Sequence, residues 1–277
     1  MKASCTTYRG ILHNHSACSK EGCYPLHELR RRWAPILDFA AMTEHAERTT
    51  ATDYASYIQE CDELSNQDFC FIPGLEVATE SGDMLLLGCR TFICTRDPFQ
   101  VLQQAAEAGN CFVILAHPEE GKMLPAVLEQ AHGMEGWNGG HMGGYMPPID
   151  WLSAWSRRLP AGKVVTGGND IHKIDPRRKI VTFVQSASLR AEDLLDALKD
   201  GRFTTGNGLF SLTSRGHVLR YKDDVTRQPL FALLARGYRQ SWRSFNACLE
   251  IGGTVLAASG LDKQQRTRLN RLIRQRL

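Results

Sequence analysis

The sequence predicts an α/β fold with a largely parallel sheet. Apolar, strand-like runs alternate with helical stretches over residues 8–210, and the links between them are short. About seven strands are expected, which favours a closed or distorted barrel; a doubly wound open sheet is the alternative. In six of the seven strand–helix units, a polar side chain able to do chemistry lies at or just past the strand's C-terminal end. Barrel enzymes assemble their sites at that end.

The expected elements follow the chain in order. Strands are predicted at Tyr8–Leu12, Ile36–Thr43, Phe69–Ile72, Met84–Gly88, Cys111–Ala116, Met134–Trp137 and Lys163–Thr166. Helices are predicted at Leu26–Trp33, Ala51–Leu64, Pro98–Ala108, Leu124–Ala131, Asp150–Arg158 and Ala191–Leu198. The last helix has leucines at helical spacing. His117 is expected to be extended, because Pro118 follows it, and Asp83 is expected to precede its strand.

The charge of the chain divides it into two parts. Residues 211–277 contain 13 lysines and arginines against 4 aspartates and glutamates, a balance of +9. Because the whole chain carries +3, residues 1–210 carry −6, and an acidic body suits a cation site. We therefore expect a barrel domain over 1–210 and a basic, mainly helical extension over 211–277. The chain is long enough for one large core with such an appendage.

The basic extension is expected to contain helices at Leu230–Trp242 and Gln264–Leu277, each with leucines on one face. The favoured interpretation is a helical cap whose basic face is solvated. The alternative is an electrostatic docking site for nucleic acid or an acidic partner. A membrane-surface role is disfavoured, because the terminal stretch lacks tryptophan.

Cysteine usage and the N-terminus favour a cytoplasmic protein. The nine cysteines are an odd number without a C-x-x-C pair, and several lie in apolar runs, so reduced core thiols are expected rather than disulfides. No apolar run approaches the roughly 18 residues of a membrane-spanning helix. The N-terminus also lacks the apolar segment of a signal peptide.

Nine residues able to bind metal lie at or near the strand-like runs. Two pairs, His13-x-His15 and Asp170-x-His172, begin and close the pattern. Between them come Glu21, His45, Glu76, Asp83 and His117. Residues i and i+2 of a strand point the same way, so each pair can direct two donors at one point. Two pairs with single donors between them predict a centre that holds two or three divalent cations.

These residues lie in motifs that resemble those of the PHP (polymerase and histidinol phosphatase) superfamily. Leu12-His13-Asn14-His15-Ser16, followed by Ser19-Lys20-Glu21-Gly22, is similar to the first motif. The later motifs are matched in order by Thr43-Glu44-His45, Pro73-Gly74-Leu75-Glu76-Val77, Ala116-His117-Pro118, Trp137-Asn138-Gly139 and Gly167-Gly168-Asn169-Asp170-Ile171-His172. The resemblance covers roughly residues 8–210.

The resemblance implies a distorted (βα)₇ barrel and metal-dependent hydrolysis of phosphate esters. It implies a first cation at His13, His15, Glu76 and Asp170, with Glu76 bridging to a second cation. The second cation would add His117 and Asp83, and the third would take His45, His172 and Glu21.

Three departures from the family pattern matter. Lys20-Glu21 stands where members often carry Asp or His. Glu44 replaces the usual Asp and is expected to position the ligands without binding a cation itself. Asp83 stands where many members have histidine. A more oxygen-rich second site favours manganese, iron or magnesium over zinc, although zinc also accepts mixed sites.

The ligand set alone suits phosphate-ester hydrolysis, one of the slowest uncatalysed reactions. Two cations about 3.5–4 Å apart can activate a bridging hydroxide and clamp the phosphoryl oxygens. His172 or His45, or a metal-bound water, is expected to protonate the leaving oxygen. Lys173, Arg177 and Arg178 are expected to bind phosphate; the alternative is a solvated loop. The expected substrate is a small phosphorylated metabolite or a nucleotide or oligonucleotide phosphate. The alternatives are hydrolysis of a C–N or C–O bond and a non-catalytic binding or regulatory protein.

Overall fold

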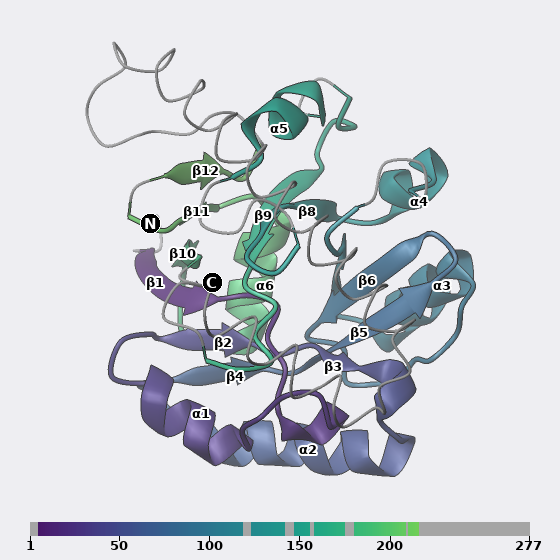
Figure 1. Cartoon of the computed structure of the whole chain (residues 1–277). Coiled ribbons are helices and arrows are strands. Elements are labelled where there is room, and N and C mark those ends of the chain that lie inside the picture. The colour runs from purple at the N-terminus through teal and green to yellow at the C-terminus, as the bar shows by residue number, and fades with distance from the viewer. Residues whose placement is uncertain are drawn as a thin grey trace, which may run out of the picture. The chain divides into compact units, whose positions relative to one another are not determined.

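Two six-stranded sheets carry the strands of this mixed α/β protein, as the computed structural model shows (Figure 1). The structure describes residues 5–118, 123–141, 147–155, 158–174, 180–208 and 210–215. The first sheet has the order β12-β11-β10-β1-β2-β4, with β1 at Thr6–Ile11, β2 at Phe39–Ala41, β4 at Cys70–Ile72, β10 at Val181–Ser186, β11 at Phe203–Gly206 and β12 at Ser211–Thr213. The second has the order β3-β5-β6-β7-β8-β9, with β3 at Glu44–His45, β5 at Gly74–Thr79, β6 at Gly82–Leu87, β7 at Phe112–Leu115, β8 at Gly133–Asn138 and β9 at Val164–Gly168.

Antiparallel pairing is as common as parallel pairing in the described sheets, so the prediction of a largely parallel sheet is wrong. β1 pairs parallel with β2 but antiparallel with β10. β6 runs antiparallel to both β5 and β7. The sequence analysis missed the tight turn between β5 and β6, where Gly82 has a φ of 97°, a conformation that favours glycine. Asp83 therefore lies inside β6, not before a strand.

Hydrogen bonds also join segments that belong to different sheets. The amide of Asn169 donates to the carbonyl of Leu12 at 3.0 Å, and the amide of Asp170 donates to His13 at 2.7 Å. These bonds hold the chain just after β9 against the chain just after β1. The predicted closure into a distorted (βα)₇ barrel remains a prediction; the architecture seen here is mixed α/β with two sheets.

The helices lie close to where the sequence predicts them. The bounds are α1 at Leu26–Trp33, α2 at Ala51–Leu64, α3 at Pro98–Ala108, α4 at Pro125–Gln130, α5 at Ile149–Trp155 and α6 at Ala191–Lys199. The first three match the prediction, because their starts carry clear signals. Thr50 caps α2 through its hydroxyl, which accepts from the Asp53 amide, and Asp97 caps α3 just before Pro98. Figure 1 shows α1 and α2 side by side next to β2 and β4.

Helix α6 completes a core to which both sheets contribute. Its Leu194 and Leu198 are fully buried in one hydrophobic cluster with Phe39 of β2, Leu85 of β6 and Phe112 of β7. A second, larger cluster packs α1, α2 and α3 against the sheets. These layers hold the ends of β1, β7 and β9 in fixed positions, and those ends carry the predicted ligands.

Strands β10, β11 and β12 were not predicted. In β10, at Val181–Ser186, buried and exposed residues alternate from Thr182 onward, a period-two pattern that is typical of a strand. β12 pairs with β11 beyond the predicted boundary at residue 210. The predicted helices Leu230–Trp242 and Gln264–Leu277 lie outside the described residues, so the domain division remains a prediction.

The cysteines of the described residues are all free, as expected for reduced thiols. Cys61, Cys70, Cys89 and Cys111 are buried, whereas Cys5, Cys23 and Cys94 are exposed. Among the helices that the structure describes, none has the length and apolar composition needed to cross a membrane. The cytoplasmic location remains a prediction.

Candidate metal centre

The structure brings all nine predicted ligands into one neighbourhood. His13 and His15 follow β1, His45 ends β3, Glu76 lies within β5 and Asp83 within β6, His117 follows β7, Asp170 and His172 follow β9, and Glu21 follows the 3₁₀ turn Ala17–Ser19. Three groups of potential ligands form there, and within each group the ligand atoms lie within 4.8 Å of one another.

The first group joins His13, His15, Glu76 and Asp170, and all four are buried. Glu76 Oε2 lies 3.1 Å from His13 Nε2 and 3.2 Å from His15 Nε2. Asp170 Oδ1 lies 3.3 Å from His15 Nε2 and 3.7 Å from His13 Nε2. Two imidazoles and two carboxylates from three separate segments thus meet at one point.

The second group joins Glu76, Asp83 and His117. His117 Nε2 lies 3.2 Å from Glu76 Oε1 and 3.9 Å from Asp83 Oδ2. Glu76 therefore directs one carboxylate oxygen to the first group and the other to the second. This is the arrangement that a carboxylate bridging two cations requires.

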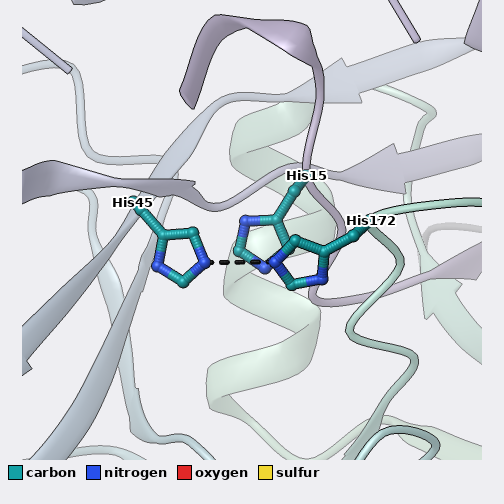
Figure 2. Close-up of side chains that lie close together, drawn as sticks. All are labelled: His15, His45 and His172. Carbon is teal, nitrogen blue, oxygen red and sulfur yellow. Dashed lines mark hydrogen bonds between the residues drawn. The ribbon is translucent and has the colours of Figure 1, made fainter. Parts of the chain in front are cut away.

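The third group joins His15, His45 and His172. Figure 2 shows the three imidazoles converging, and the Nε2 atoms of His45 and His172 lie 3.2 Å apart. Glu21 Oε2 lies 3.2 Å from His45 Nε2 and 3.6 Å from His172 Nε2. Glu21 also pairs with Arg48 at 3.2 Å. The side chains of Glu21 and Asp83, 36% and 38% exposed, are the least enclosed of the predicted ligands.

Three predicted ligands have left-handed backbones. The φ angles are 59° for His13, 59° for His117 and 53° for Asp170. The expectation of an extended His117 is therefore wrong, and the His13 and Asp170 pairs lie in tight turns past the strand ends. Such conformations cost about 1–3 kcal/mol each and concentrate at functional sites. Here they turn the side chains into the cluster directly after each strand.

Glu135 in β8 was not predicted, yet it holds His13 in place. Its Oε1 lies 2.9 Å from His13 Nδ1, and its Oε2 accepts from Asn138 Nδ2 at 2.8 Å. Both are fully buried. A carboxylate only accepts, so His13 Nδ1 carries the proton and Nε2 is directed to the cluster. A Cβ on Gly168 would lie only 1.8 Å from Glu135 Oε1, so this contact requires glycine there.

Glu44 lies next to the ligands and bonds the backbone that carries them, as expected. It is fully buried, and its two oxygens accept from the amides of Ser16 and Ser19 at 2.8 and 3.1 Å. These bonds fix the turn after His15. Glu44 precedes His45 in β3. This short strand therefore positions both His45 and the turn after His15.

Burial and charge act in opposite directions on the pKa values of the cluster. Burial would lower the pKa of His15, but the nearby carboxylates of Asp170 and Glu76 outweigh burial and raise it to about 9. The pKa of His13 is also raised well above its usual value, because the carboxylates of Glu135, Glu76 and Asp170 outweigh the effect of burial. Burial would raise the pKa of Glu76, but the charge of His13 and the close contacts of His117, His13 and His15 hold it well below the usual range. The cluster therefore combines protonated imidazoles with ionised carboxylates.

The geometry of His15 fits a cation better than a set of hydrogen bonds. His15 is buried, and both ring nitrogens lack a hydrogen bond of acceptable geometry among the described residues. Its Nε2 nevertheless lies within 3.3 Å of Glu76 and of Asp170. Buried polar atoms are rarely left without a partner. Lone pairs that converge without hydrogen-bond geometry are what a shared cation requires.

Metal uptake is expected to release protons. His13 and His15 are protonated at pH 7 without a cation, and a cation binds only the neutral imidazole. Because His15 has a pKa of about 9, affinity should rise with pH up to that value. Isothermal titration with Mn²⁺ in buffers of different ionisation enthalpy measures this, and we expect more than one proton released for the first cation. Uptake without proton release would contradict the assignment of these histidines.

The predicted phosphate-binding residues are only partly placed. Lys173 is exposed next to His172, while Arg177 and Arg178 lie outside the described residues. His141 was not predicted as a ligand, yet it touches the cluster. Its Nε2 lies 3.0 Å from Asp170 Oδ2, and its ring stacks on His117.

Comparison with known proteins places the fold. No protein-family model and no curated protein matches the chain. It resembles the structure of a two-domain protein from Bacteroides vulgatus containing a predicted PHP-like metal-dependent phosphoesterase, with 19% identity and a TM-score of 0.58. The match covers 74% of this chain and 66% of that chain, just under two thirds of its length. PsfC from Pseudomonas syringae PB-5123 matches with 15% identity and a TM-score of 0.53 over 86% of this chain and 99% of that one. At these identities the likeness shows a shared, PHP-like fold.

Proposed function

We propose that this protein is a metal-dependent phosphoesterase with two or three divalent cations, of manganese, iron, zinc or magnesium. The observation that carries the proposal is the convergence of the four buried ligands His13, His15, Glu76 and Asp170. The shared fold with a PHP-like phosphoesterase supports the same class. We also propose that the two sheets form the distorted (βα)₇ barrel, supported by the hydrogen bonds between the ends of β9 and β1.

The groups of ligands give each cation a place in the proposal. The first cation would be held by the four buried ligands, the second by Glu76, Asp83 and His117, and the third by His45, His172 and Glu21. Cations at such sites acidify a bound water and neutralise charge on the phosphoryl oxygens. Glu76, with one oxygen in each of two groups, keeps the first two cations together.

The less buried histidines suit the role of proton donor. The side chains of His45 and His172 are 17% and 33% exposed, whereas His13 and His15 are fully buried. If the third site holds no cation, His45 or His172 can protonate a leaving group that enters from solvent. Lys173, the next residue, and the more distant Arg177 and Arg178 are proposed to bind phosphate.

A cavity beside the second group offers room for the substrate. It has a volume of about 510 Å³ and is lined by Asp83, His117, Arg96 and His141, among others. Arg96 adds a cationic residue to the lining of this cavity. A small phosphorylated metabolite or a nucleotide phosphate is therefore the proposed substrate class.

The test is a phosphate-release screen with the full-length protein. Protein stripped with chelator and reloaded with Mn²⁺, Fe²⁺, Zn²⁺ or Mg²⁺ is given a panel of phosphomonoesters and phosphodiesters. We expect turnover with at least one metal, and none for the apoprotein or for the doubly substituted His13→Ala, His15→Ala control. No release with any metal would overturn the proposal in favour of a C–N or C–O hydrolase or a binding protein.

A further inference from the structure

His141 lies on the turn after β8, outside the nine predicted ligands. The turn is held in place because the amides of Gly140 and His141 both donate to Asn138 Oδ1, at 2.7 and 3.0 Å. Asn138 in turn donates to the buried Glu135. The same hydrogen-bonded chain that orients His13 therefore also positions the backbone of His141.

The side chain of His141 is 60% exposed, yet its ring reaches the cluster. Its Nε2 lies 3.0 Å from Asp170 Oδ2. Its ring stacks on that of His117 with centroids 4.4 Å apart and an angle of 22°. Ligand atoms of His117, His141 and Asp170 lie within 4.8 Å of one another. Three donors from three different segments thus form a fourth group.

The turn approaches Asp170 as closely as its backbone allows. A Cβ on Gly140 would lie 2.8 Å from Asp170 Oδ2 and 3.3 Å from Asn138 Oδ1. Glycine at this position therefore lets His141 reach the carboxylate. A plain ion pair with Asp170 is the simpler interpretation, and for a 60% exposed side chain it would contribute little to stability. An ion pair alone does not explain why His117 stacks on His141, nor why a ring nitrogen of His117 lies close to the ligand atoms of His141 and Asp170.

The two oxygens of Asp170 face different partners. Oδ1 lies 3.3 Å from Nε2 of His15, which belongs to the first group, and 3.3 Å from Nδ1 of His172. Oδ2 faces His141 instead. Asp170 thus has the same division of oxygens as Glu76, which serves the first group with one oxygen and His117 with the other.

We propose that His141 is a metal ligand that acts with His117 and the second oxygen of Asp170. A neutral imidazole offers one lone pair to a cation, so His117 serves one cation at a time. The cation at His141 is therefore the one that also contacts Glu76 and Asp83. Asp170 then bridges the first two cations together with Glu76. This inference rests on the proposed metal centre and adds a tenth ligand to it.

The first experiment compares cation affinity between matched variants. Full-length His141→Ala and His27→Ala proteins are titrated with Mn²⁺, and free Mn²⁺ is followed by electron paramagnetic resonance. His27 is an exposed residue of α1 and serves as the control. We expect His141→Ala to weaken one cation site by about tenfold, while His27→Ala leaves all sites unchanged.

The second experiment needs no substitution. Diethyl pyrocarbonate modifies accessible histidines, and peptide mass spectrometry reports each one. In the wild-type protein we expect Mn²⁺ to suppress modification of His141 but not of His27. Equal Mn²⁺ affinity of the His141→Ala and wild-type proteins, with His141 equally modified with and without Mn²⁺, would overturn the inference while leaving the proposed function standing. A wild-type protein that binds no cation would instead overturn the metal centre itself.

Discussion

Glu76→Gln is expected to lower kcat/KM for a phosphate ester by about a thousandfold or more. The substitution keeps the size of the side chain but replaces one oxygen with an amide and removes the charge. Glu76 is 2% exposed and contacts His13, His15 and His117 through its two oxygens. The substitution removes a ligand oxygen from one cation site, and the loss of the negative charge weakens both sites. Several kcal/mol of transition-state stabilisation depend on those cations.

The metal content of the Glu76→Gln protein should fall with its activity. Elemental analysis after dialysis measures the bound cations per chain, and Glu107→Gln is the matched control. Glu107 is exposed on α3 and bonds only Gln103 among the contacts found in the described residues, so this control should retain metal and activity. A Glu76→Gln protein with wild-type metal content and turnover would show that Glu76 is not a ligand.

Glu135→Gln is expected to weaken binding of the first cation by about 10–100-fold. The carboxylate accepts a hydrogen bond from His13 Nδ1 on one oxygen and from the Asn138 side-chain amide on the other. The amide of the substituted side chain keeps one oxygen that can accept a hydrogen bond. Its NH₂ group cannot accept, so it faces one of the two donors, His13 Nδ1 or Asn138 Nδ2, without forming a hydrogen bond. His13 then loses the charged partner that fixes its tautomer and makes Nε2 a better ligand.

The Glu135→Gln effect should appear in affinity and not only in stability. A Mn²⁺ titration gives the affinity, and thermal unfolding of the apoprotein separates it from a general loss of structure. Glu129→Gln, at an exposed position of α4, is the control and should bind Mn²⁺ as tightly as wild type. If Glu135→Gln and Glu129→Gln had the same affinity, the support of His13 by Glu135 would have no part in metal binding.

The residues of the candidate centre were predictable because their types and their order along the chain are typical of a metal site. Two His or Asp pairs at i and i+2, each after an apolar run, identify the outer ligands, and the resemblance to PHP motifs adds Glu76 and His117. The left-handed backbones of His13, His117 and Asp170 could not be predicted from the sequence in this way. All three residues follow strand ends, and the turns at His13 and Asp170 accompany hydrogen bonds between the ends of β1 and β9 that join residues far apart in the sequence.

The supporting residues were harder to predict, for different reasons. Glu135 left a signal, since it is a carboxylate inside the mostly apolar, fully buried strand Gly133–Asn138, where an unpaired charge is unfavourable. His141 left none, because its direction depends on two amides that bond Asn138. The antiparallel strands of the first sheet depend on long-range pairing with β1, which local periodicity does not specify.

Anomalous diffraction from crystals of the Mn²⁺-loaded protein is the most direct test of the metal centre. Data collected at the manganese absorption edge locate bound cations without assumptions about the ligands. We expect at least two peaks, one between His13, His15, Glu76 and Asp170 and one beside His117 on the other side of Glu76. A fully loaded crystal with no peak at these side chains would contradict the account.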